Sequence, residues 1–226
     1  MRWVFSMVRI CVSIPAITTE AAIRAIKGIV DPDLIELRLD YATEPLNIKS
    51  LRDSTNKPLI ATARVKSHGG LWRGNEEERL SLLLSAVRAR FDYIDVEADS
   101  SFSREIVREA HANDVSVIVS NHYLDRVPNL EEILAVYHEC GDADIVKVVG
   151  TARSSADNLR CLESLECFPG NICFAMGAIG VPSRVLSPLM GAAFTYASTG
   201  GDTTVAFGQL TLSKMREIYR LMEVAP

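Results

Sequence analysis

The sequence predicts an α/β protein that forms one (β/α)8 barrel, a single domain spanning residues 1–226. Short apolar runs of strand length alternate with longer segments of helical periodicity along the whole chain. The apolar runs begin 22 to 35 residues apart, which leaves room for a strand, a helix and two loops in each interval. An open doubly wound sheet would give the same local pattern, but eight consecutive units favour the closed barrel.

The eight predicted strands lack the alternation of polar and apolar residues that is typical of a strand with one wet face. This absence favours parallel strands that are covered on both sides. In chain order, the predicted strands span residues 8–14, 33–39, 58–65, 93–97, 115–120, 144–149, 171–176 and 193–197.

Capping signals predict where two of the intervening helices begin. Asn75 with Glu78, and Asn129 with Glu132, have the spacing of a capping box ahead of an apolar stripe. The last helix is expected to begin near Gln209. Helices are also predicted around residues 46–53 and 183–190, but fewer signals support these two. The second contains a proline, which disfavours the interior of an α-helix.

Composition argues against several classes of partner. The formal net charge is −5 and no dense run of Lys and Arg is present, so nucleic acid and anionic membranes are poor ligands. No stretch reaches the roughly 20 apolar residues of a membrane span, and the apolar run at the N-terminus is too short for a signal peptide. We therefore expect a cytoplasmic protein.

The five cysteines argue against a disulfide framework and a zinc site. Their number is odd, and none stands in a C-x-x-C pair or near a His at metal-ligand spacing. The segment after the first strand, residues 14–17, also lacks every glycine of a dinucleotide fingerprint. We expect reduced cysteines, no metal and no dinucleotide fold.

The carboxyl ends of the predicted strands carry mostly polar side chains that do not suit a buried strand. In a barrel, catalytic residues come from these strand ends and from the loops that follow them. The candidate site residues, in chain order, are Ser13, Glu36, Arg38, Arg64, Glu97, His122, Lys147 and Met176, with Arg184 and Gln209 after the last two strands.

Lys147 interrupts an apolar run, Ile145 to Val149. An ammonium on such a strand must point into the barrel, where burial disfavours its charged form. A neutral amine attacks carbonyl carbons, which is how Schiff-base lysines act. From this run alone, a structural Lys paired with a barrel carboxylate is an equal alternative.

His122 follows the fifth strand, where an imidazole can act as a general acid or base. A loop histidine that only caps the next helix is the alternative. Glu97, at the end of the neighbouring fourth strand, suits a role in orienting His122.

Glu36 and Arg38 lie two residues apart and therefore share one face of the second strand. Inward-facing charges are costly unless they serve a site or pair with each other. Arg64 and Arg184 can add guanidinium forks for a carboxylate substrate.

Taken in order, these residues resemble the type I 3-dehydroquinate dehydratase family, the Schiff-base-forming class of the shikimate pathway. The resemblance covers nearly the whole chain, from Ser13 to the last helix. The motifs that carry it are Glu36-x-Arg38-x-Asp40, Arg64 followed by Gly69-Gly70, Asp95-Val96-Glu97, Ser120-Asn121-His122, Asp144-Ile145-x-Lys147, Met176 then Ser183-Arg184, and Gly208-Gln209.

The resemblance implies dehydration of 3-dehydroquinate to 3-dehydroshikimate by syn elimination. Lys147 would form an imine with the C3 ketone, His122 would act as general acid and base, and Glu97 would orient His122. No cofactor is expected, because the iminium is the electron sink. Family members are often dimers, so a homodimer is a further expectation. The matching substrate contacts are Ser13, Glu36, Arg38, Arg64, Met176, Arg184 and Gln209.

The chain departs from the family pattern at three places. Tyr123 stands where an acidic residue is usual, and His68 stands where a Glu often precedes the double glycine. The family's lid segment Ser-Ala-Pro-Gly-Gln is represented by residues 205–209, which contain no serine unless Thr203 or Thr204 shifts into its place.

Two other functions compete with this interpretation. An aldolase-type Schiff-base barrel could bind a sugar phosphate at the loop that contains residues 198–201, since barrels often hold phosphate there. The second alternative is a barrel that binds a ligand without turnover, and the presence of both Lys147 and His122 disfavours it.

Overall fold

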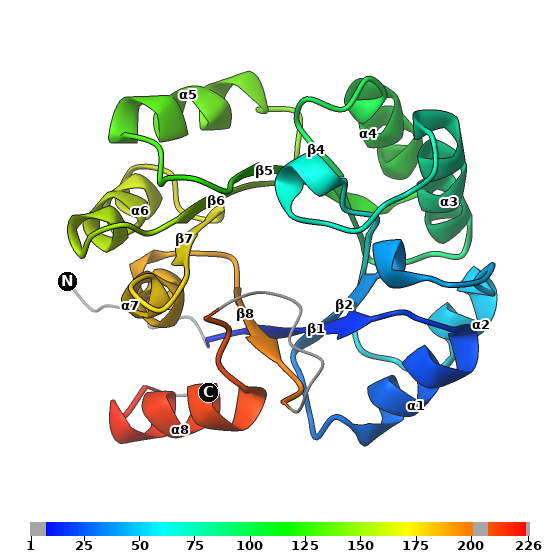
Figure 1. The fold of residues 1–226 in the computed structure, drawn as a ribbon, viewed down its shortest axis with the longest axis horizontal. Helices are drawn as coiled ribbons and strands as arrows, with labels where there is room; N and C mark the ends of the chain where they lie inside the picture. Colours follow the sequence, from blue (N-terminus) through cyan, green and yellow to red (C-terminus); the bar gives the residue numbers. More distant parts are fainter. Residues whose placement is uncertain (1–7, 201–207, 225–226) are drawn as a thin grey trace.

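Eight parallel strands surround a central axis and helices cover them on the outside in the computed structural model, which describes residues 8–200 and 208–224 (Figure 1). Each strand overlaps one predicted run, so the prediction of eight strands is confirmed. They are β1 (Ile10–Pro15), β2 (Leu34–Arg38), β3 (Leu59–Thr62), β4 (Tyr93–Glu97), β5 (Ser116–Tyr123), β6 (Ile145–Thr151), β7 (Ile172–Met176) and β8 (Thr195–Ser198).

The order of the strands nearly closes the barrel. Hydrogen-bonded neighbours run β7-β6-β5-β4-β3-β2-β1-β8, so β1 pairs in parallel with both β2 and β8. At the remaining seam, the Ala193 N–H donates to the Asn171 carbonyl (3.0 Å) just before β7 and β8 begin. The predicted (β/α)8 fold is therefore confirmed.

The helices follow the strands as expected, and both predicted capping boxes form. The Asn75 side chain accepts from the Glu78 N–H (2.8 Å), and the Glu78 carboxylate accepts from the Asn75 N–H (2.9 Å). Asn129 and Glu132 repeat the arrangement. The helices are α1 (Thr19–Gly28), α2 (Ile48–Asp53), α3 (Glu76–Arg88), α4 (Ser103–His111), α5 (Leu130–Glu139), α6 (Ala156–Cys167), α7 (Val181–Leu186) and α8 (Leu212–Leu221).

Two predicted helix boundaries are corrected. The last helix begins at Leu212 rather than near Gln209, because the Thr211 side chain accepts from the Lys214 N–H and caps it there. The helix predicted over residues 183–190 is instead α7 followed by a 3₁₀ turn, Ser187–Met190, since Pro188 has no N–H to continue the α-helical bonds.

Side chains that point into the barrel form layers, because every second residue of a strand faces the same side. Toward the amino ends of the strands the inward residues are apolar and pack together. This floor consists of Cys11, Leu34, Ile60, Ile118, Ile145, Ile172 and Phe194. Two residues further along every strand except β7, which carries Phe174, the same face carries buried side chains with polar atoms, and these are Ser13, Glu36, Thr62, Asp95, Ser120, Lys147 and Tyr196.

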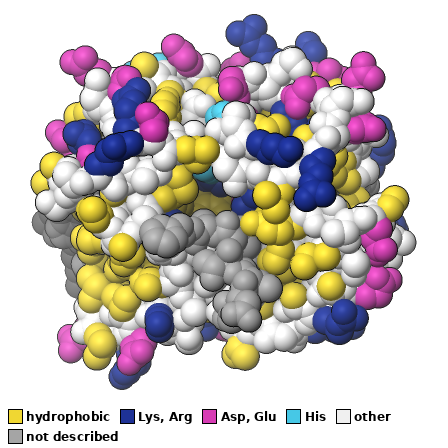
Figure 2. Space-filling view, viewed as in Figure 1, with side chains coloured by type: hydrophobic (Ala, Val, Ile, Leu, Met, Phe, Trp, Pro, Cys, Tyr) yellow, Lys and Arg dark blue, Asp and Glu magenta, His cyan; other side chains and the backbone are white. Residues whose placement is uncertain are grey.

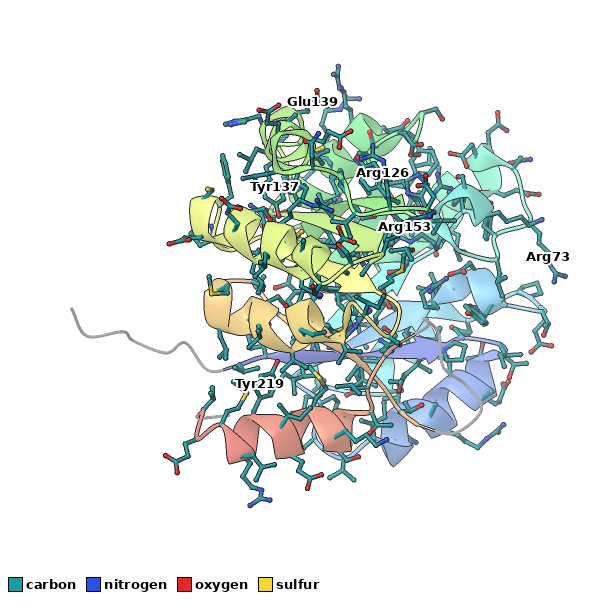
Figure 3. The ribbon with its side chains drawn as sticks, turned by 60° about the vertical axis from the view of Figure 1, so that its left-hand side comes forward. Arg73, Arg126, Tyr137, Glu139, Arg153 and Tyr219 are labelled. Carbon is teal, nitrogen blue, oxygen red and sulfur yellow. The ribbon has the colours of Figure 1, made fainter. Side chains whose placement is uncertain are left out.

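Apolar contacts outside the barrel fix the helices to the sheet. Tyr219 of α8, labelled in Figure 3, packs with Val12 and Val185 and donates its hydroxyl to the Val185 carbonyl of α7 (2.7 Å). The five cysteines are free, as expected, and three of them are buried. Among the helices that the structure describes, none has the length and apolar content to cross a bilayer.

Candidate active site

A cavity of about 250 Å³ opens at the carboxyl ends of the strands. Figure 2 shows the corresponding hollow near the middle of this face, with basic side chains deep inside it. Of the ten predicted site residues, the cavity wall contains nine: Ser13, Glu36, Arg38, Arg64, His122, Lys147, Met176, Arg184 and Gln209. Glu97 is the exception, and it lies behind this wall.

Lys147 lies at the bottom of the cavity with only 3% of its surface exposed. Its Nζ lies 2.6 Å from Asp95 Oδ2, 3.2 Å from the Tyr196 hydroxyl and 3.9 Å from Glu36 Oε1. The expectation that this side chain turns into the barrel is confirmed. It is also paired with a carboxylate, so the amine is held in one position before any ligand arrives.

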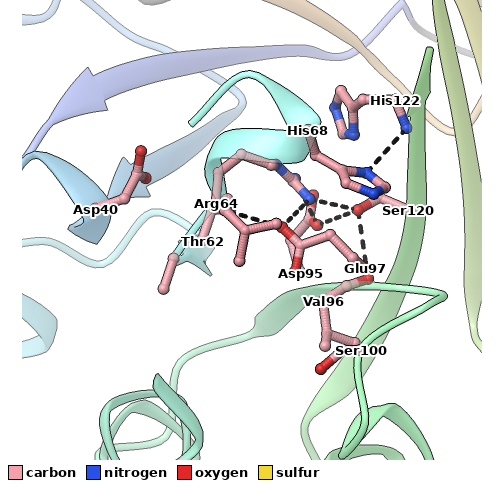
Figure 4. Close-up of polar contacts among 12 residues, drawn as sticks. Asp40, Thr62, Arg64, His68, Asp95, Val96, Glu97, Ser100, Ser120 and His122 are labelled. Carbon is pink, nitrogen blue, oxygen red and sulfur yellow. Dashed lines mark hydrogen bonds and ion pairs between the residues drawn. The ribbon is translucent and has the colours of Figure 1, made fainter. Parts of the chain in front are cut away.

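A buried network holds the carboxylate that faces Lys147 (Figure 4). Arg64 donates to Asp95 (2.7 Å), to Glu97 (2.9 Å) and to the Ser120 hydroxyl (2.6 Å). Burial alone would raise the pKa of Asp95, but Arg64 and Lys147 outweigh burial and lower that pKa to about 2. Asp95 therefore stays ionised, and the pKa of Arg64 is raised in turn by Asp95 and Glu97 despite burial.

Glu36 and Arg38 face inward, as predicted, but they do not pair with each other. Arg38 makes two hydrogen bonds to Asp40 (2.8 and 2.7 Å), and Asp40 also accepts from the Leu71 N–H. Glu36 accepts from the Thr62 hydroxyl (3.0 Å). Each charge therefore has its own partner, and both line the cavity.

The expected contact between Glu97 and His122 does not form, which corrects the orienting role predicted for Glu97. One Glu97 oxygen accepts from Arg64 and from the Val65 N–H, and the other accepts from Arg79 of α3. Both Glu97 oxygens therefore accept hydrogen bonds from the segment after β3 and from α3, and neither segment lies near His122 in the sequence. Burial would raise the pKa of Glu97, but Arg64 and Arg79 lower it.

His122 stands at the end of β5, and its buried Nδ1 has no hydrogen-bond partner in the described part of the chain. Burial lowers the pKa of His122 well below its ordinary value, and the cations Arg64 and Lys147 lower it further. The imidazole is therefore neutral at pH 7 and able to take a proton. The group beside it is His68, whose ring centroid lies 5.9 Å away.

Arg184 supplies a cation without a counterion at the opposite wall. It is 2% exposed, it stacks over the Phe174 ring (4.2 Å), and its Nε has no hydrogen-bond partner. Within residues 8–200 and 208–224, no carboxylate pairs with it, and burial lowers its pKa to about 10. A guanidinium in this state is suited to bind an anion.

Gln209 and Ser13 meet at the edge of the cavity. The Gln209 amide lies 3.5 Å from the Ser13 hydroxyl, and its carbonyl oxygen is buried without a partner among the residues that the structure describes. This unsatisfied acceptor faces the same space as Arg184. Thr203 and Thr204, the candidate substitutes for the family's lid serine, lie outside the described residues.

Sequence reasoning did not select four residues that the structure brings to the site. Asp95 and Ser120 form the network under Lys147, and Phe174 and Tyr196 line the cavity near Arg184. Asp95 and Ser120 each lie two residues before a predicted site residue, Glu97 and His122. Because every second residue of a strand faces the same side, this spacing could have identified them. In the described part of the chain, no cluster of three His, Cys, Asp or Glu could hold a metal.

Comparisons with known proteins show the family of the chain. A family model described as "Type I 3-dehydroquinase" matches residues 10–226. The chain belongs to the type I 3-dehydroquinase family. A 3-dehydroquinate dehydratase of Desulfotalea psychrophila is 37% identical over 219 residues, covering 93% of this chain and 96% of the relative. One of Methanocaldococcus jannaschii is 30% identical over 220 residues, covering 95% and 99%.

Solved structures give the same result. Type I 3-dehydroquinate dehydratase of Clostridium difficile superposes with a TM-score of 0.82 at 26% identity, covering 96% of this chain and 92% of that one. The chain is therefore a hydro-lyase of the type I 3-dehydroquinase family, and the sugar-phosphate alternative has less support.

Arg184→Met is expected to raise the free energy of unfolding of the ligand-free protein by about 1 to 3 kcal/mol at pH 7. Because the fold lowers the pKa of Arg184 to about 10, charging this group disfavours the folded state at every lower pH. The penalty disappears only as pH rises above the ordinary arginine value. Equilibrium urea unfolding measures the effect.

The matched control is Arg220→Met, which changes an exposed arginine near the end of α8 and should alter stability by less than about 0.5 kcal/mol. If Arg184→Met is less stable than the unsubstituted protein, Arg184 is not a net cost to the fold.

Proposed function

We propose that this chain dehydrates 3-dehydroquinate to 3-dehydroshikimate through an imine on Lys147. The observation that carries the proposal is the position of the Lys147 amine, which is buried at the bottom of the cavity and fixed by Asp95. Once the ammonium has lost a proton to solvent, the amine can attack a ketone carbon within the cavity to form a carbinolamine, which takes up a proton and loses water to give an iminium.

The environment of Lys147 favours the iminium. The iminium nitrogen carries the same positive charge as the ammonium, so the Asp95 carboxylate 2.6 Å away can stabilise both. Arg64 holds Asp95 from the other side, and Ser120 donates to the same carboxylate (2.7 Å). The countercharge is thus positioned before the reaction begins, and little reorganisation is needed.

His122 is the proposed general base and acid. Its lowered pKa keeps the imidazole neutral, so it can remove a C2 proton that the neighbouring iminium has made acidic. The electrons left on C2 form an enamine, which then expels the C1 hydroxyl. The proton on His122 goes to that hydroxyl, and one water leaves. Hydrolysis of the conjugated imine releases the product and restores Lys147.

The remaining lining residues suit the polar groups of the substrate. Arg184 is the proposed partner of the substrate carboxylate, because it is the buried cation that no carboxylate neutralises in the described residues. Gln209 and Ser13 lie beside it with free hydrogen-bonding capacity for hydroxyls. On the far side, Glu36, Arg38 and Arg64 offer further polar contacts, and Met176 packs on the ring.

We also propose a cytoplasmic homodimer in which residues 1–226 act as one catalytic domain. The composition and the family resemblance support this proposal, and it implies two copies of the same cavity. Light scattering of the purified protein would separate the dimer from a monomer of 24.8 kDa.

Borohydride added during turnover of 3-dehydroquinate is expected to trap a covalent adduct on Lys147, because it reduces the iminium to a stable secondary amine. Peptide mass spectrometry locates the adduct. Lys147→Met should give no adduct and no turnover. Lys49→Met is the matched control, since Lys49 is exposed and pairs with Asp53 far from the cavity. Turnover by Lys147→Met, or trapping on another lysine, would contradict the proposal.

His122→Ala is expected to retain borohydride trapping but to lose about 100-fold to 10,000-fold in kcat, the usual contribution of general acid-base catalysis. The appearance of the conjugated product by ultraviolet absorbance measures the rate. His138→Ala, which changes an exposed histidine of α5, is the control and should turn over normally. An unchanged kcat in His122→Ala would remove this residue from the mechanism.

A further inference from the structure

His68 adjoins His122 in an arrangement that the steps above do not use. It ends the 3₁₀ turn Lys66–His68 and is only 9% exposed. Gly69 follows it with a positive φ of 79°, and a Cβ at Gly69 would lie 3.2 Å from the Leu124 side chain. The turn is therefore packed against the end of β5, and the ring of His68 is directed at the backbone of His122.

Both nitrogens of the His68 ring have partners. The backbone N–H of His122 donates to His68 Nδ1 (3.2 Å; Figure 4). His68 Nε2 lies 3.3 Å from Asp99 Oδ2, in the loop after β4. The rings of His68 and His122 meet edge to face, with an interplanar angle of 70°.

These contacts give each ring nitrogen of His68 one role. An imidazole nitrogen that accepts a hydrogen bond carries no proton, so the proton is on Nε2, where it donates to Asp99. His68 Nδ1 is thus the acceptor for the partly buried backbone N–H of His122, and removing this acceptor would leave that N–H without its partner.

We propose that His68, held by Asp99, is a positioning residue for His122. The inference rests on the role proposed above for His122. His68 keeps the end of β5 in place through the His122 N–H and holds the His122 ring against the cavity through the contact between the two rings.

Two substitutions separate positioning from simple support of the fold. His68→Phe keeps a planar ring but has no acceptor, and we expect kcat to fall about tenfold while KM changes less than about twofold. His68→Asn places an amide oxygen near the position of Nδ1, and we expect it to recover most of the lost kcat.

The matched control is His111, an exposed histidine that also pairs with an aspartate, Asp144 (2.9 Å). His111→Phe and His111→Asn should leave kcat unchanged. Equal activity of His68→Phe and the unsubstituted protein would overturn the inference. So would a kcat of His68→Asn that is no higher than that of His68→Phe.

Borohydride trapping distinguishes this inference from the proposed function. All His68 variants should still form the adduct on Lys147, because His68 does not contact that amine. Loss of trapping in the unsubstituted protein would contradict the proposed imine chemistry, whereas normal trapping with no difference between His68→Phe and His68→Asn would contradict only the role of His68.

Discussion

The buried carboxylate of Asp95 is the interaction on which the site depends. It lies between Arg64 and Lys147, and the two cations keep its pKa at about 2 in a position where burial alone would favour the neutral acid. Removing either cation would leave the buried Asp95 carboxylate with one neighbouring cation instead of two. The same ion pairs connect β3, β4 and β6, so the geometry of the reactive amine and the packing of the barrel interior are set together.

The layers of the barrel explain why this charged cluster is tolerated. Except on β7, where Phe174 follows Ile172, each inward-facing apolar residue of the floor is followed, two residues later, by a polar residue of the next layer, as Ile145 is followed by Lys147. Water is excluded from below, which strengthens every ion pair above the floor. The cost of burying the charges is offset because most of them have partners.

Much of the fold and part of the site could be predicted from sequence because charged residues on apolar strands are conspicuous. Lys147 and Glu36 were found in this way. Tyr196 was not, since an aromatic residue on a strand is typical of a core, and only its contact with the Lys147 amine reveals otherwise. The prediction for Glu97 was wrong in its partner, because Arg79 reaches Glu97 from α3, and no local pattern encodes that approach.

The two sides of the cavity also differ in whether their arginines are paired with carboxylates. On the side of β2 to β4, Arg38 and Arg64 are paired with carboxylates, so an anion there would compete with Asp40, Asp95 and Glu97. On the side of β7 and β8, Arg184 lies against an aromatic ring and has no such competitor among the described residues. A substrate with one carboxylate therefore gains most by turning it toward Arg184.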